Sequence, residues 1–125
     1  MTDRNPKFIQ AFVYAFHGWR RGLTERSFKI DLIAAIFVLT AALFFRLSLS
    51  EWLIVIFLIG AVISAELTNT AIEEICDLIT ARLKLHYSDT TAPRDLAAGA
   101  SLAMAVVAAL IGLIIFIPKV LTLLL

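Results

Sequence analysis

The chain has little of what a disulfide-bonded, zinc-binding or nucleic-acid-binding protein needs. Its 125 residues include one cysteine, Cys76, and two histidines, His17 and His86. A single cysteine cannot form a disulfide within the chain, and two histidines so far apart in the sequence do not make a metal-ligand pair. The net charge is only +1, and no run of basic residues alternates with aromatic residues. Nucleic acid is therefore not an expected partner.

Charged residues are also scarce, at 17% of the chain against 61% apolar residues. Soluble domains usually have about 45–50% apolar and about 25% charged residues. A chain of 125 residues cannot bury that much aliphatic surface in a core of its own. We therefore expect an all-α integral membrane protein, with residues 1–125 forming one domain whose remaining apolar surface is covered by lipid or by a partner subunit.

Three segments are long and apolar enough to cross a bilayer, which takes about 20 residues of helix. We expect membrane-spanning helices over residues 30–47, 52–77 and 96–117. Ser50 is the expected N-cap of the second helix, with Glu51 in its first turn, and Pro118 is expected to mark the end of the third span.

The segment before the first span has a different pattern, which predicts an amphipathic helix over residues 6–23 that lies on the membrane surface. This helix is expected to start at Asn5-Pro6. The first 25 residues of the chain do not have the pattern of a cleavable signal peptide. The large apolar side chains of the expected helix recur at intervals of three and four residues: Phe8, Phe12, Phe16, Trp19 and Leu23.

Basic residues are distributed unequally around the three spans. Of the 11 lysine and arginine residues, only Arg46 and Lys119 lie outside the N-terminal region and the connection between the second and third spans. The positive-inside rule then predicts that the N-terminus and the 78–95 loop are cytoplasmic and that the C-terminus is outside.

Four polar residues, Glu66, Asn69, Glu73 and Asp77, follow the apolar run 52–65 at spacings of three, four and four. We call them the polar ladder. On a helix they fall within an arc of about 80° and so share one face. An acidic group near the hydrocarbon region costs at least about 2.5 kcal/mol on insertion scales, so the polar ladder marks a candidate functional site.

The residue types of the polar ladder are consistent with three functions. Glu73 and Asp77 suit a hard cation such as Mg²⁺ that keeps water and phosphate oxygens as ligands, while the deeper Glu66 suits a proton acceptor for a substrate hydroxyl. Together they fit phosphoryl transfer to a lipid. The same pattern also fits a proton or cation pathway through an oligomeric channel or transporter, or a structural polar seam between helices.

The polar ladder resembles the signature of a known family. Residues 66–73, Glu-Leu-Thr-Asn-Thr-Ala-Ile-Glu, followed by Asp77, are similar to the E-x-x-N-[ST]-A-I-E-x-x-x-D motif of the bacterial diacylglycerol kinase and undecaprenol kinase family. Other positions are similar to the family and stand in the same order along the chain: Tyr14, Gly18, residues 25–30 and residues 94–100. The resemblance therefore covers nearly the whole chain.

The resemblance implies a small three-span lipid kinase with a surface helix, working in the bacterial inner membrane as a homotrimer whose active sites are shared between subunits. It implies ATP as co-substrate and Mg²⁺ as cofactor. Glu66 matches the general base that deprotonates the lipid hydroxyl, Asn69 the signature amide of the active site, and Glu25 with Glu73 the pair that holds the metal. Thr70 is near enough to contact the lipid. The resemblance also implies a nucleotide site formed by Lys7, Tyr14, Glu25, Glu73, Asp77, Arg94 and Asp95.

The chain departs from the family pattern at two places. Arg94 stands where the family usually has lysine, and the 79–93 connection lacks the usual Glu-Tyr-His run, so its nucleotide contacts are not assigned. Glu74 points about 100° away from Glu73 on a helix, and we expect it to be a solvated or interfacial charge.

The resemblance favours undecaprenol as the lipid over diacylglycerol. Residues 69–72, 50–52 and 116–119 look more like the undecaprenol kinase branch. Diacylglycerol, which gives phosphatidic acid, is the alternative substrate.

Overall fold

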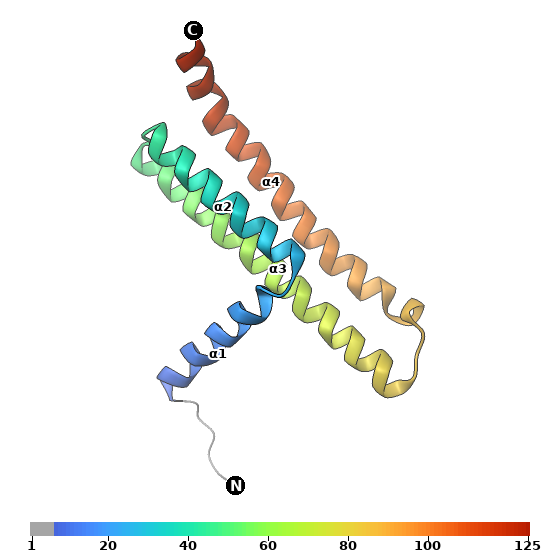
Figure 1. Ribbon diagram of the computed structural model, residues 1–125. Helices are drawn as coiled ribbons and strands as arrows, with labels where there is room; N and C mark the ends of the chain where they lie inside the picture. The colour runs from blue at the N-terminus through green and yellow to red at the C-terminus, as the bar shows by residue number, and fades with distance from the viewer. Residues whose placement is uncertain (1–6) are drawn as a thin grey trace.

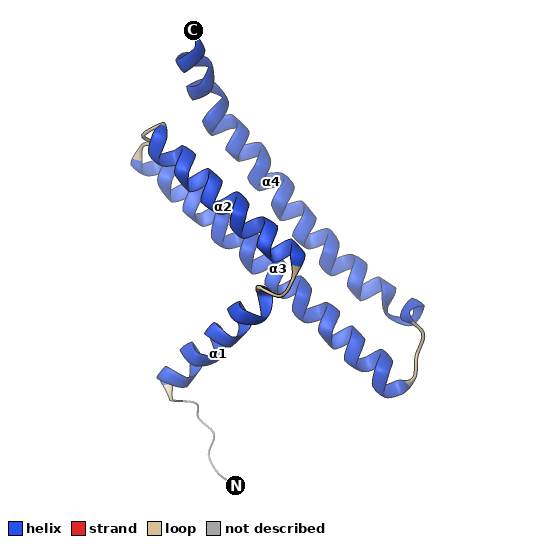
Figure 2. Ribbon diagram, in the orientation of Figure 1, coloured by secondary structure: helices blue, strands red, loops and turns tan. Residues whose placement is uncertain are grey.

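The computed structural model describes residues 7–125, and every regular element in that range is helical (Figures 1 and 2). The expected helix start at Asn5-Pro6 lies outside the described residues. Three of the helical segments are long and apolar enough to cross a membrane, as expected for an all-α membrane protein. The elements in chain order are α1 (Phe8–Gly22), α2 (Arg26–Phe44), α3 (Leu49–Leu83), the 3₁₀ helix η1 (Tyr87–Thr90) and α4 (Thr91–Leu124).

Helix α3 is the centre of the arrangement, because α2 and α4 both pack against it. Helix α1 also contacts α3, but it projects away from the other three helices at the corner where α2 begins (Figure 1). The ends of α3 and α4 that η1 connects extend past this corner (Figure 1). The 35 residues of α3 correspond to about 52 Å of helix, well above the roughly 30 Å of a hydrocarbon core.

A capping box fixes the start of α3. The Ser48 hydroxyl accepts a hydrogen bond from the Glu51 amide at 3.3 Å, and the Glu51 carboxylate accepts one from the Ser48 amide at 2.9 Å. The expected N-cap, Ser50, is therefore wrong by two residues, although Glu51 does lie in the first turn. Ser50 instead places its hydroxyl 3.2 Å from that of Ser48.

Helix α4 continues past Pro118, where we expected the membrane interface. Of the two expected outcomes for residues 120–125, an extended helix or a frayed end, the structure has the extended helix, which ends at Leu124. Proline removes one backbone donor, but helices in membranes tolerate this loss where neighbouring groups compensate.

A cluster of buried apolar residues lies at the turn between α2 and α3. The Leu47 amide donates to the Ala42 carbonyl at 3.2 Å and the Arg46 amide to the Leu43 carbonyl at 3.3 Å, the two bonds of a Schellman motif. This motif requires a left-handed residue, and Arg46 has φ of 52°. Ala42 and Leu47 are buried there with Val55, and partly buried side chains of α4 pack against them.

Most other large apolar side chains on α2, α3 and α4 are exposed in the single chain. Lipid or another subunit must cover them, as the composition predicted.

Polar contacts at three levels set the register of the antiparallel pair α3 and α4. The α4 residues in these contacts are Arg94, Ser101 and Lys119, which are separated by 7 and by 18 residues, about two and five turns, and so lie on one stripe of the helix. The contacts are Asp77 with Arg94 at 2.7 Å, Glu66 with Ser101 at 2.8 Å and Glu51 with Lys119 at 3.2 Å.

Candidate functional site

The polar ladder of α3 faces α4, and its first two members, Glu66 and Asn69, are buried. Glu66 and Asn69 are each 9% exposed and Thr70 is 8% exposed. Burying polar side chains costs free energy unless they have hydrogen-bond partners, so the partners of each residue indicate what the site is built to do.

Glu66 has one partner on the facing helix. The Ser101 hydroxyl of α4 donates a hydrogen bond of 2.8 Å to Glu66 Oε2. A neutral donor supports a buried carboxylate without neutralising its charge. The arrangement suits a carboxylate that accepts a proton from a substrate.

Asn69 is only partly satisfied. Its amide nitrogen lies 3.4 Å from Glu73 Oε1, a long donor contact, while its Oδ1 is buried without a hydrogen-bond partner. An unpaired buried acceptor costs about 1–3 kcal/mol. Asn69 lines an open groove of about 380 Å³ between α3 and α4, together with Ala97 and Ala100. Asn69 Oδ1 is therefore available to accept a hydrogen bond or to bind a cation.

Asp77 and Arg94 form the lower contact between the two helices. Arg94 Nη2 lies 2.7 Å from Asp77 Oδ1, and Arg94 Nε donates to the Thr90 hydroxyl at 3.0 Å. The guanidinium also lies 4.5 Å above the Tyr87 ring. The Arg94 side chain is 9% exposed and that of Asp77 69%, so the carboxylate retains an accessible side.

The corner between α1 and α2 places Glu25 within electrostatic range of Arg21. Glu25 is the N-cap of α2, three residues after the end of α1. Arg21 Nε makes a 2.7 Å ion pair with Glu74 Oε1, so Glu74 is paired rather than simply solvated. Hydrogen bonding and charge from Glu74, with a smaller contribution from Glu25, raise the pKa of the Arg21 guanidinium above its ordinary value. Glu25 thus interacts electrostatically with Arg21, and the ion-pair partner of Arg21, Glu74, is the residue that follows Glu73.

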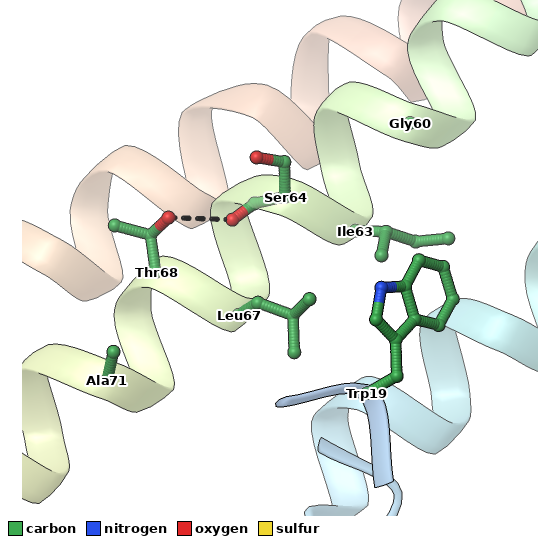
Figure 3. A pocket seen from close by; sticks show the side chains of 7 residues that line it. All are labelled: Trp19, Gly60, Ile63, Ser64, Leu67, Thr68 and Ala71. Atoms are coloured by element: carbon green, nitrogen blue, oxygen red, sulfur yellow. Dashed lines mark hydrogen bonds between the residues drawn. The ribbon is translucent and has the colours of Figure 1, made fainter. Parts of the chain in front are cut away.

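A second open groove, of about 470 Å³, lies on the α1 side of α3. Figure 3 shows Trp19 facing Ile63 and Leu67 across it, and the Thr68 hydroxyl bonding the Ser64 carbonyl at 2.8 Å. The Trp19 ring also packs edge-on against Phe28, with 6.0 Å between centroids. The groove is mainly apolar, so it suits an apolar chain rather than a phosphate.

Other residues predicted for the site are exposed in the single chain. Lys7 and Tyr14 lie on the surface at and in α1, and Asp95 lies on the surface of α4. Within residues 7–125 no three histidine, cysteine or acidic side chains gather as a metal cluster. The nucleotide roles of Lys7, Tyr14, Asp77, Arg94 and Asp95 stay predictions.

Sequence reasoning missed two residues at Glu66. Ser101 lies among the alanine and glycine residues of the third span, and a single serine there does not form a repeating polar pattern. Asp31 lies partly buried in α2, within range for its carboxylate to interact electrostatically with that of Glu66. The presence of an acidic residue at the edge of the first apolar run was the signal that could have found it.

The donor set fits a magnesium ion that is held mainly by substrate. Mg²⁺ in phosphoryl-transfer sites is usually bound by one or two carboxylates together with phosphate oxygens and water. The carboxylates of Glu73 and Glu25 are ligands of that type, and the unpaired Asn69 Oδ1 lies one helical turn before Glu73 on α3. A cluster of three carboxylates is not required.

Comparison with known proteins gives the family. Residues 13–116 match the prokaryotic diacylglycerol kinase family. The chain is 44% identical over 114 residues to the undecaprenol kinase of Bacillus subtilis, covering 90% of each chain. It is 29% identical over 119 residues to the diacylglycerol kinase of Synechocystis, covering 94% of this chain and 67% of that one. No solved structure matches.

These matches decide between the functions that the polar ladder alone left open, because both named relatives are kinases of lipids rather than channels or transporters. The chain belongs to the prokaryotic diacylglycerol kinase family and is a membrane lipid kinase.

Proposed function

We propose that the chain is an undecaprenol kinase, which transfers the γ-phosphate of ATP to the primary hydroxyl of undecaprenol and gives undecaprenyl phosphate. The observation that carries the choice of lipid is the 44% identity to an undecaprenol kinase over 90% of both chains. The buried, hydroxyl-bonded Glu66 supports the chemistry, because it supplies a carboxylate whose partner on α4 is a neutral hydroxyl.

In the proposed reaction Glu66 accepts the hydroxyl proton of the lipid. The lipid oxygen forms a bond to the γ-phosphorus as the bond from that phosphorus to the β–γ bridging oxygen breaks, and ADP leaves. Magnesium, when bound, neutralises charge on the phosphate oxygens. Glu25 and Glu73 would hold the ion, and Asn69 would place its free Oδ1 toward the bound substrates.

The remaining site residues are proposed to bind the two substrates. Thr70, which is buried one helical turn after Glu66 on α3, contacts the lipid headgroup. Asp77 keeps an accessible side, and Arg94 is held by that carboxylate and by Thr90. The proposed nucleotide site comprises Lys7, Tyr14, Glu25, Glu73, Asp77, Arg94 and Asp95.

The proposed setting is the bacterial inner membrane, with the N-terminus and the 78–95 loop in the cytoplasm and the C-terminus outside. Helix α1 would lie on the cytoplasmic surface, which agrees with its projection from the bundle and its exposed Phe8, Phe12 and Phe16 (Figure 1). A homotrimer with active sites shared between subunits would cover the exposed apolar faces of α2 and α4.

The experiment that tests the lipid uses radiolabelled ATP and purified protein in mixed micelles with either undecaprenol or diacylglycerol. Undecaprenol is expected to be phosphorylated faster. Much faster labelling of diacylglycerol would overturn the choice and favour the alternative, which the 29% identity to a diacylglycerol kinase supports.

The metal assignment is tested separately with Glu25→Gln and Glu73→Gln. Each change removes a charge from the proposed magnesium site, so we expect weaker magnesium-dependent nucleotide binding in a calorimetric titration. Glu74→Gln is the matched control, because Glu74 pairs with Arg21 instead. Unchanged apparent magnesium affinity in the first two variants would contradict the assignment.

A further inference from the structure

We propose that Ser101 is the positioning residue of the catalytic base: its hydroxyl holds one oxygen of Glu66 and so leaves the other to accept the proton of the lipid. The inference rests on the proposed role of Glu66 as the base. It adds a residue on α4, outside the signature motif of α3, to the group that sets the rate of phosphoryl transfer.

The direction of the Ser101 hydrogen bond is the first support. Serine and threonine in helices commonly bond back to the carbonyl four residues earlier. Thr40, Thr68 and Thr122 do so in this structure, at 2.8 Å in each case. The Ser101 hydroxyl instead crosses from α4 to α3 and donates to Glu66 Oε2 at 2.8 Å. The Ser101 hydroxyl therefore binds the Glu66 carboxylate rather than a carbonyl of its own helix.

A comparison with Asp77 gives the second support. Glu66 and Asp77 are 11 residues apart on α3, about three turns, and both face the same stripe of α4. Asp77 meets the guanidinium of Arg94, a full positive charge, at 2.7 Å. Glu66 meets a neutral hydroxyl, which orients the carboxylate but does not supply an opposing full charge. Of these two acidic positions, Asp77 has a cationic partner, whereas the partner that Glu66 has on α4 is a hydroxyl that can only orient it.

The need for such an orienting bond follows from the surroundings of Glu66. The side chain is 9% exposed, so water cannot freely satisfy its oxygens, and the neighbouring carboxylate of Asp31 interacts with it electrostatically. Without a partner on α4, the Glu66 carboxylate can rotate among its rotamers. A base that is misplaced by about 1 Å can lose about a hundredfold in rate.

The test measures kcat and both KM values for Ser101→Ala, Ser101→Thr and wild type in undecaprenol mixed micelles. We expect Ser101→Ala to lower kcat by about tenfold to a hundredfold, as for loss of one hydrogen bond to a charged group, with little change in either KM. Ser101→Thr keeps the hydroxyl and is expected to restore most of kcat. Thr40→Val is the matched control, because the Thr40 hydroxyl bonds only its own helix, and it should keep the wild-type kcat.

Thermal unfolding of each variant in the same micelles shows whether it is folded. If Ser101→Ala does not purify in folded form, Ser101→Cys, which keeps the volume but donates weakly, replaces it with the same expectation. A wild-type kcat for the hydroxyl-free variant, or a loss confined to KM, would overturn the inference.

Glu66→Gln, measured in parallel, separates this inference from the proposed function. An inactive Glu66→Gln with a fully active Ser101→Ala rejects the role of Ser101 and keeps Glu66 as the base. An active Glu66→Gln rejects the base itself.

Discussion

Gly22, the last residue of α1, lies where that helix meets α3, and we predict that it cannot be replaced by alanine without loss of stability. A Cβ atom at this position would lie 2.8 Å from Leu67 Cδ2 and 3.3 Å from two atoms of the Phe28 ring. Phe28 is fully buried, whereas Leu67 is only partly buried and lines the groove beside Trp19. The close approach therefore requires glycine for space rather than for backbone freedom.

The size of the effect follows from two opposing terms. Overpacking of a well-packed position typically costs about 1–3 kcal/mol. Replacing glycine by alanine in a helix returns up to about 1 kcal/mol, and less at a helix end. We therefore expect Gly22→Ala to destabilise the protein by about 1–2 kcal/mol, and to shift the corner that carries Glu25.

Gly18 provides the matched control in the same helix. A Cβ atom there has no described heavy atom within 4 Å, so Gly18→Ala is expected to be neutral or stabilising by up to about 1 kcal/mol. Thermal unfolding in detergent micelles measures both variants. Leu67→Ala removes the closest obstacle, so Gly22→Ala should cost less in that background. Equal stability of the two glycine variants in the wild-type background would refute the packing argument.

Two further substitutions test other contacts by the same unfolding measurement. Asp77→Asn removes the charge that meets the buried Arg94, and we expect a loss of about 1–2 kcal/mol, less than for a fully buried pair because the Asp77 side chain is 69% exposed. No loss would mean that Thr90 and Tyr87 already satisfy the guanidinium. Arg46→Gly relieves a left-handed residue with φ of 52° and is expected to stabilise by up to about 1 kcal/mol; a destabilised variant would show that the Arg46 side chain contributes more than its backbone costs.

The helical class and the shared face of the polar ladder could be predicted from the sequence, because both follow from periodicity and hydropathy. The ends of the helices could not. Helix α3 continues to Leu83, past the expected end at residue 77. Hydropathy marks only the part of a helix that lies in the membrane, so it does not indicate where the helix ends outside it. The start of α3 was misplaced at Ser50 because two serines precede Glu51, and only Ser48 has the spacing of a capping box.

The partners of the polar ladder were even less predictable. Ser101 and Arg94 belong to α4 and Asp31 belongs to α2, and nothing in their local sequence indicates which residue of α3 each one meets. Those contacts depend on the register between antiparallel helices. Likewise, Glu74 was correctly separated from the face of Glu73, but its ion pair with Arg21 depends on where α1 crosses α3.

The central claim is that the buried carboxylate of Glu66 accepts the proton of a lipid hydroxyl during phosphoryl transfer from ATP. The most direct test compares wild type with Glu66→Gln, which keeps the volume but removes the base. Transfer of labelled phosphate from Mg-ATP to undecaprenol in mixed micelles and nucleotide binding by calorimetry are measured on the same preparations. We expect Glu66→Gln to lose transfer and to keep Mg-ATP binding. Transfer at the wild-type rate by Glu66→Gln would contradict it.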